Sequence, residues 1–279
     1  MMKAPALCAF LCAGLLFPCA AAQEDDAARD AEECRAEAEK GDAWAQCQMG
    51  VRYGQGRGVP KDEARAAEWF RKAAVQGNSL AQFNLGILYD NGAGVEKDAA
   101  KAAEWYTKAA ELGDDDAQFN LANMYLEGRG VKQDTAQAVK WLSRAASLNN
   151  ASAMCSLGIL CAEGQGVEKN DAKAVYWFLL AAQLGNINAC YNLGVMYENA
   201  RGVEWDGAKA AALYRKAAEL GHAEARLNLG VMYVNGSGVE KDAAKAAYWF
   251  GKAAEQGNAD AQYNLGSMYD HGEGVEKDA

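Results

Sequence analysis

Asn-Ser-Leu-Ala-Gln-Phe-Asn-Leu-Gly-Ile-Leu-Tyr, residues 78–89, opens the segment that decides the fold. The segment continues with Asp-Asn-Gly-Ala-Gly-Val (90–95) and ends with Glu-Lys-Asp-Ala-Ala-Lys-Ala-Ala-Glu-Trp-Tyr-Thr-Lys-Ala-Ala-Glu-Leu-Gly (96–113). Its second loop glycine recurs every 36 residues, at Gly58, Gly94, Gly130, Gly166, Gly202, Gly238 and Gly274. A fixed period of this size predicts an elongated solenoid of stacked units, in which each unit contacts only its neighbours.

Each unit carries the start and stop signals of two antiparallel helices. Residues with good N-cap side chains precede the first helix, with His222 as the exception, and a second capping series precedes the second helix. Glycine pairs such as Gly92 and Gly94 break the first helix, because glycine accepts positive φ without steric cost. Gly77 and its equivalents, with Asn149 in one unit, end the second helix. We therefore predict an all-α fold.

Small and aromatic positions predict how the units pack. Paired alanines such as Ala109 and Ala110 recur in the second helix and allow the helices to approach closely. We interpret the tryptophans of the second helices as core residues that fill the wider gaps; they are Trp69, Trp105, Trp141, Trp177 and Trp249. Burial of one such side chain stabilises the fold by roughly 1.5–3 kcal/mol.

The first 22 residues have the pattern of a secretory signal peptide. Lys3 supplies a positive charge, Leu7 to Phe17 is an apolar run, and Ala20-Ala21-Ala22 offers a cleavage site before Gln23. The apolar run is shorter than the roughly 20 residues that span a membrane. We therefore expect cleavage after Ala22, no stable membrane insertion afterwards, and a periplasmic or secreted protein.

The mature chain divides into a cap and about 6.5 units. Residues 23–41 form an acidic lead-in and an N-terminal cap helix, because Arg29 to Gly41 aligns with Arg65 to Gly77 of the next unit. The solenoid units are 42–77, 78–113, 114–149, 150–185, 186–221, 222–257 and a truncated 258–279.

The charge balance argues against nucleic-acid partners. The chain has 28 Lys and Arg against 38 Asp and Glu, a net charge of −10, and a surface this acidic repels phosphate backbones. The chain has two histidines, His222 and His271, both expected to be solvated, and this removes most metal and Ser-His or Cys-His arrangements. We expect neither a metal nor a cofactor.

The repeated motif resembles the Sel-one-like repeat (SLR) family, a relative of the tetratricopeptide repeats. The resemblance rests on Leu-Gly-x-x-Tyr, Gly-x-Gly-Val, Asp-x-x-x-Ala and Trp-(Tyr/Phe)-x-Lys-Ala-Ala, and it covers Arg29 to Ala279. It implies a right-handed α/α superhelix that serves as a scaffold for protein interaction, and an exported bacterial protein. Departures include Ala200 for the first loop glycine and Ala122 for the glycine after leucine.

By analogy with the tetratricopeptide repeats, the first helices line a concave groove that binds a protein or peptide. On these first helices the candidate partner-binding residues are the aromatic residues and asparagines at two adjacent positions of the repeat. They are Phe83, Asn84, Phe119, Asn120, Tyr191, Asn192, Asn228, Tyr263 and Asn264. An amide can donate to and accept from a peptide backbone, and an aromatic ring adds apolar contact. A residue that recurs in most units is usually structural. This favours the alternative that each asparagine ties one unit to the next through a backbone hydrogen bond.

Two alternative functions come from other classes. Penicillin-hydrolysing activity has been attributed to some cysteine-rich secreted SLR proteins, so a secreted β-lactamase-type hydrolase is one alternative. None of the seven serines begins a Ser-x-x-Lys motif, which counts against it. The other alternative is a structural envelope spacer without a specific ligand. We interpret the chain as a non-enzymatic scaffold.

The mature chain keeps five cysteines, Cys34, Cys47, Cys155, Cys161 and Cys190, so at least one thiol is free or bridges to another chain. Cys34 and Cys47 lie on either side of one helix–turn–helix and are the candidate disulfide. Such a bridge needs their Cα atoms within about 7 Å. For Cys161 and Cys190 the alternative is a small reduced core residue.

Overall fold

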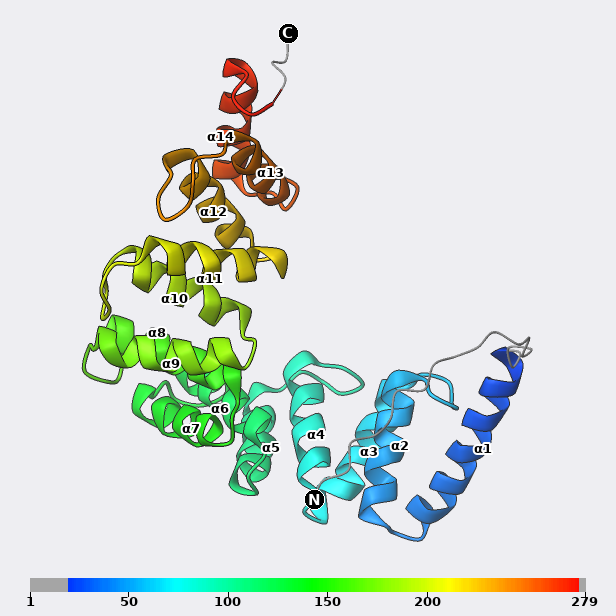
Figure 1. Cartoon of the computed structure of the whole chain (residues 1–279). Helices are drawn as coiled ribbons and strands as arrows, with labels where there is room; N and C mark the ends of the chain where they lie inside the picture. The colour runs from blue at the N-terminus through cyan, green and yellow to red at the C-terminus, as the bar shows by residue number, and fades with distance from the viewer. Residues whose placement is uncertain (1–19, 276–279) are drawn as a thin grey trace, which may run out of the picture.

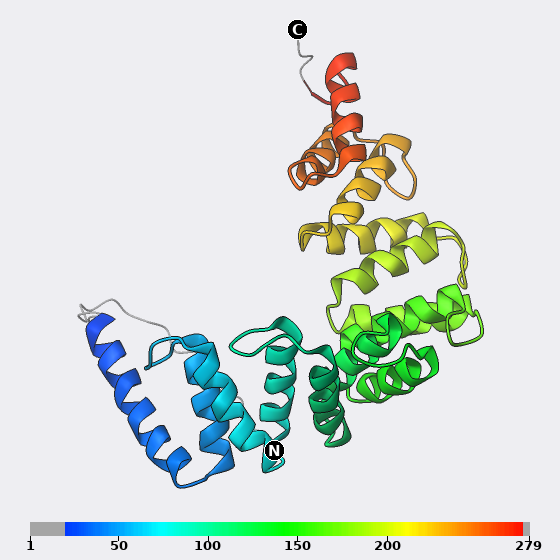
Figure 2. The ribbon, with the colours of Figure 1, turned by 180° about the vertical axis from the view of Figure 1, so that it is seen from behind.

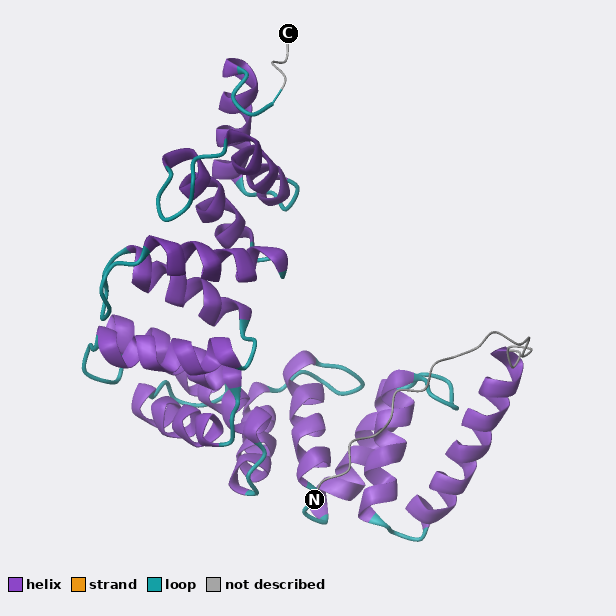
Figure 3. Ribbon diagram, viewed as in Figure 1, coloured by secondary structure: helices purple, strands orange, loops and turns teal. Residues whose placement is uncertain are grey.

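The computed structural model describes residues 20–275, which form 14 α-helices and no strand (Figures 1 and 3). The first helices of the units are α2 (Ala43–Gln55), α4 (Ser79–Asn91), α6 (Asp115–Glu127), α8 (Ala151–Glu163), α10 (Ile187–Glu198), α12 (Ala223–Asn235) and α14 (Ala259–His271). The second helices are α1 (Ala20–Glu39), α3 (Glu63–Val75), α5 (Ala99–Glu111), α7 (Thr135–Ser147), α9 (Asp171–Gln183), α11 (Gly207–Glu219) and α13 (Ala243–Ala254). The all-α solenoid prediction is confirmed.

Parts of two sequence predictions lie outside the described residues. Of the predicted signal peptide, residues 1–19 lie outside the described residues, and so does the last part of the truncated unit, residues 276–279. The helix predicted as an N-terminal cap is α1, which contacts α2 as a second helix contacts the first helix of the next unit.

The helix ends are set by the predicted side chains. Asn78 Oδ1 accepts a hydrogen bond from Ala81 N at 2.9 Å, and Asp98 Oδ1 accepts one from Lys101 N at 3.0 Å, so both free helix starts are capped. His222, the expected exception, caps α12 in the same way, because its Nδ1 accepts from Ala225 N at 3.2 Å. Asn149 takes the left-handed φ of 68° that glycine takes at the equivalent ends.

The core of most units is a ring packed on a glycine, and the tryptophans predicted as core residues do pack against this core, although four of the five are only partly buried. A Cβ atom added to Gly86 of α4 would lie 2.7 Å from the ring of Tyr106 on α5, and that ring is 2 % exposed. Trp105, one residue earlier, is half-buried, with Lys108 Nζ 3.9 Å from the centroid of its ring. The residue after the tryptophan therefore fills the core, and most of the tryptophans lie at its edge; Trp141 alone of the five is buried.

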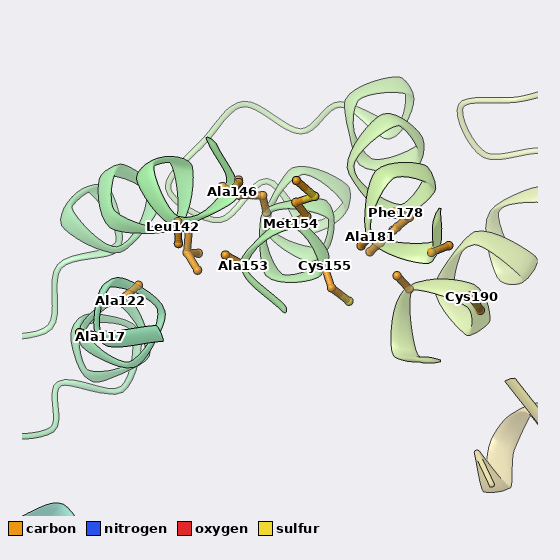
Figure 4. Packing of buried hydrophobic residues seen from close by; sticks show 14 of the residues in the cluster. Ala117, Ala122, Leu142, Ala146, Ala153, Met154, Cys155, Phe178, Ala181 and Cys190 are labelled. Atoms are coloured by element: carbon orange, nitrogen blue, oxygen red, sulfur yellow. The ribbon is translucent and has the colours of Figure 1, made fainter. Parts of the chain in front are cut away.

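The third unit keeps this packing with different residues. Ala122 stands where the other first helices have glycine, and Leu142 stands where the other second helices from α3 to α13 have a ring. Both side chains are fully buried in the continuous core (Figure 4). Because Leu142 on α7 is smaller than a ring, the core has room for the methyl group of Ala122 on α6.

Each unit joins the preceding one through its second loop glycine. The Cα of Gly94 lies against the backbone of Glu63, at the start of α3, so closely that an added Cβ would overlap the Glu63 carbonyl group. Gly58 makes the equivalent contact with Ala27 of α1. Repetition of this joint produces the curved row of helix pairs that Figures 1 and 2 show from opposite sides, with α1 at one end and α14 at the other.

Candidate functional site

The predicted partner-binding residues all lie on first helices, from α4 to α14. All of them are half-buried except Tyr263, which is 78 % exposed. Phe83 and Tyr191 also pack within their own units, with ring centroids 5.9 Å from Tyr106 and 5.7 Å from Tyr214. These aromatic residues therefore contribute to the core through one side of the ring and to the surface through the other.

The asparagines do not share one hydrogen-bond pattern. Asn84 Nδ2 donates to Leu80 O at 2.7 Å, within its own helix, which is not the bond between units that the structural alternative expected. Asn192 Nδ2 makes only a long contact of 4.0 Å with Cys155 Sγ of the preceding unit. Asn120 lies beside a buried phenol, since burial raises the pKa of Tyr106 to about 12 and the Asn120 amide opposes that shift.

The fourth unit departs from this pattern and leaves a hollow in the face. Cys155 takes the position that is aromatic in its neighbours, Ser156 takes the asparagine position, and Ser152 lies one turn earlier on α8. The three small side chains line a hollow of about 430 Å³, which we call the α8 hollow. Phe119 and Tyr191, from the units before and after, also line it. The two serines are not among the predicted partner-binding residues, because that prediction rests on residues that repeat and Ser152 and Ser156 are exceptions to the repeat.

A histidine, a tyrosine and a glutamate from two units form one side of the α8 hollow. The rings of Tyr191 and His222 are stacked, with centroids 4.4 Å apart and planes 19° apart. The His222 side chain is 14 % exposed, which corrects the expectation that it is solvated. Burial lowers its pKa, and Glu224, whose Oε2 lies 3.3 Å from Nδ1, opposes that shift.

A second hollow of about 610 Å³ continues along α8 and α10 toward the loops, and Ile159 and Asn192 line both hollows. Arg201 lies at its far end, where Nη2 bonds Asp171 Oδ1 at 2.7 Å and the Ala162 carbonyl oxygen at 3.2 Å. The two hollows are therefore neighbours on the face of the first helices. Together they place the weakly bonded amide of Asn192, the aliphatic side chain of Ile159 and aromatic rings on one surface.

The five cysteines of the described chain are free thiols. Cys34 Sγ instead lies 3.5 Å from the carbonyl oxygen of Ala45, and Cys47 is fully buried, so the structure does not contain the candidate disulfide between them. Burial raises the pKa of the Cys155 thiol to about 11, which keeps this thiol at the α8 hollow protonated and weakly nucleophilic at neutral pH.

The described residues contain no group of three His, Cys, Asp or Glu side chains that could hold a metal ion. Within the same part of the chain, no helix has both the length and the apolar character needed to cross a membrane.

Comparison with known proteins gives consistent matches. The Sel1 repeat model matches seven consecutive segments, residues 45–78, 79–114, 115–150, 151–186, 187–222, 223–258 and 259–279. A protective antigen of uropathogenic Escherichia coli strains with an SLR fold is 42% identical, with a TM-score of 0.85 over 89% of this chain and 53% of the antigen. This chain thus spans about half of that antigen. A Sel1 repeat protein from Oxalobacter formigenes is 37% identical, with a TM-score of 0.75 over 84% of this chain and 92% of that one. No curated protein matches the chain.

Proposed function

The chain belongs to the Sel1 repeat family, whose repeats generally mediate protein–protein interaction, and from this premise we propose that it is an exported scaffold. In this proposal it binds a protein or peptide partner along the face of the first helices, which we assign to the concave side of the curved array. Members of the family are mostly non-enzymatic scaffolds.

One observation carries the choice of face. The two hollows that share Ile159 and Asn192 lie side by side between α8 and α10, and together they provide apolar and amide groups over the length of two helices. Binding sites are typically concave and mostly apolar, with a few polar groups that fix the orientation of the ligand. The amide of Asn192 is available for this role because its one contact is long.

Export is supported by the sequence of the leader. Lys3, the apolar run from Leu7 to Phe17 and the small residues before Gln23 have the order of a cleavable signal. N-terminal sequencing of the protein recovered from the periplasm or the medium tests this part. A mature chain that begins at Gln23 supports export, and an uncleaved chain confined to the cytoplasm contradicts it.

The binding face is tested by capture of partners from envelope extract with immobilised residues 23–279. The test variant is Asn188→Ala/Asn192→Ala, and the matched control is Tyr176→Ala, which removes an exposed aromatic residue from the second helix α9. A partner that is lost by the double variant and kept by the control supports the proposal. A partner that is kept by the double variant and lost by the control would move the site to the second helices.

A further inference from the structure

We propose that the α8 hollow is an anchor site for one large apolar side chain, preferably aromatic, of a partner segment that carries lysine or arginine beside it. This inference rests on the proposed function, and it adds the position of the anchor and the chemistry of the partner. It follows from three properties of the hollow: its origin, its walls and its charge.

The origin of the hollow is a local loss of side-chain volume. In the units before and after, a ring at the position of Cys155 and an asparagine at the position of Ser156 occupy this part of the face. In the fourth unit both are replaced by smaller residues, while α8 keeps the 13 residues and the left-handed glycine C-cap of α6 in the unit before. The surface therefore lacks about one aromatic side chain and one amide at this point of an otherwise regular row.

The walls of the hollow favour an aromatic or large aliphatic occupant. Phe119 lies on one side and the stacked pair of Tyr191 and His222 on the other, while Ile159, 37 % exposed, adds an aliphatic wall. Aromatic rings that meet offset or edge-to-face gain about 0.5–1.5 kcal/mol beyond the burial of their area. A partner ring placed between these walls would thus replace the ring that the fourth unit lacks.

The charge around the hollow favours a cation next to that ring. Its lining contains one carboxylate, Glu224, and neither lysine nor arginine. Two more carboxylates, at the start of α6, contact the N-cap residue of α8, because Asn150 Nδ2 donates to Asp115 Oδ2 at 3.0 Å and to Asp116 Oδ1 at 3.1 Å. The chain as a whole carries a net charge of −10. Complementary charge steers association and selects the partner, so a basic residue beside the anchor is preferred over an acidic one.

The amides at the rim suit the backbone of a peptide. Asn188 is exposed and Asn192 is half-buried, one turn apart on α10, and both line the hollow. Each offers two donors and one acceptor, which match the alternating C=O and N–H groups of an extended segment. The occupant is thus a side chain on a peptide, held by its backbone, and not an isolated small molecule.

The test uses random peptides displayed on phage, selected against the folded chain. We expect enrichment of sequences with Trp, Phe, Tyr or Leu within two residues of Lys or Arg. The blocking variant is Cys155→Phe/Ser156→Asn, which introduces the residue types that the third unit has at these two positions. It therefore fills the hollow with side chains that the repeat already carries there. It should keep the helical circular dichroism of the parent chain and lower the affinity for the selected peptides at least about tenfold.

The matched control is Leu227→Phe, which adds a ring at the equivalent position of the sixth unit, at a residue that does not line the hollow. It should leave the affinity unchanged, and Glu224→Gln should weaken only the peptides that contain lysine or arginine. Enriched peptides without the apolar–basic pair, or binding that survives the blocking variant, would overturn the inference. If such surviving binding is lost in Asn188→Ala/Asn192→Ala, the proposed face stands and only the anchor is wrong. If no peptide is enriched, both fail.

Discussion

The close contact between Gly86 and Tyr106 predicts the outcome of a single added methyl group. In Gly86→Ala the new Cβ would lie 2.7 Å from two ring carbons of Tyr106, whereas carbon atoms in contact prefer about 3.5–4.0 Å. The ring is 2 % exposed and cannot move toward solvent. Overpacking of this kind costs about 1–3 kcal/mol, and the better helix propensity of alanine returns about 1 kcal/mol. We expect a net loss of stability of up to about 2 kcal/mol in this unit.

The chain contains a matched control for this substitution. Gly266 occupies the same position of the same motif on α14, but a Cβ there would have no neighbour within 4 Å. Gly266→Ala should therefore stabilise its helix by about 1 kcal/mol, through helix propensity alone. The difference between the two substitutions, about 1–3 kcal/mol, isolates the steric effect of the ring.

Amide hydrogen exchange of α4 and α14 measures the opening of each helix separately, so it resolves an effect that is confined to one unit. The double variant Gly86→Ala/Tyr106→Leu reproduces the Ala122 and Leu142 pair of the third unit and should recover part of the loss. Equal effects of the two single glycine substitutions, or no recovery in the double variant, would refute the packing argument.

Three further predictions concern the turns and the histidine cap. Gly94→Ala should lower the free energy of urea unfolding by about 2–5 kcal/mol, because it combines a left-handed φ with a clash against the preceding unit. Gly113→Ala, with a left-handed φ and open space, should lower it by only about 1–2 kcal/mol. Similar losses in the two variants would contradict the close contact of Gly94 with the preceding unit. Ala200 has a φ of 52°, so Ala200→Gly should raise the free energy of unfolding by up to about 1 kcal/mol, whereas Ala93→Gly, without positive φ, should lower it. Burial lowers the pKa of His222 below 6.5, so the His222 side chain binds a proton more readily in the unfolded chain than in the folded one. The stabilisation from the His222 cap is therefore complete above pH 6.5 and decreases as the pH falls. The urea midpoint should thus fall more between about pH 7.5 and 5 in the parent chain than in His222→Asn, and parallel curves would exclude this role.

The helices could be predicted from the sequence because their signals are local. Asn78 and Asp98 cap, and Asn149 accepts a left-handed φ, by contacts within a few residues of themselves. The choice between Trp105 and Tyr106 as the core ring could not be made in this way, because two adjacent residues on a helix are both compatible with a buried stripe. Gly86 on the other helix decides which ring is buried, because the ring of Tyr106 packs on it. The sequence signal for this pairing is that both positions change together in the third unit, to Ala122 and Leu142.

The face of the first helices could be predicted only in part. Repetition identified Phe119, Tyr191 and Asn192, which do line the α8 hollow. The hollow itself depends on residues that break the repetition, Cys155 and Ser156, and its depth depends on how the units before and after are placed. In a repeat protein the repeated residues determine the scaffold, and the exceptions to the repeat determine where one part of the surface differs from the next.

The joint at the second loop glycine has a consequence for the length of such proteins. Every complete unit carries both halves of the joint, a glycine that contacts the unit before it and a helix start that receives the glycine of the unit after it, as Gly94 and Ala99 show in the second unit. Gain or loss of one whole 36-residue unit therefore leaves each remaining joint with both partners. Chains of this kind can change length in whole steps without any compensating substitution, and a binding site confined to neighbouring units would be carried along intact.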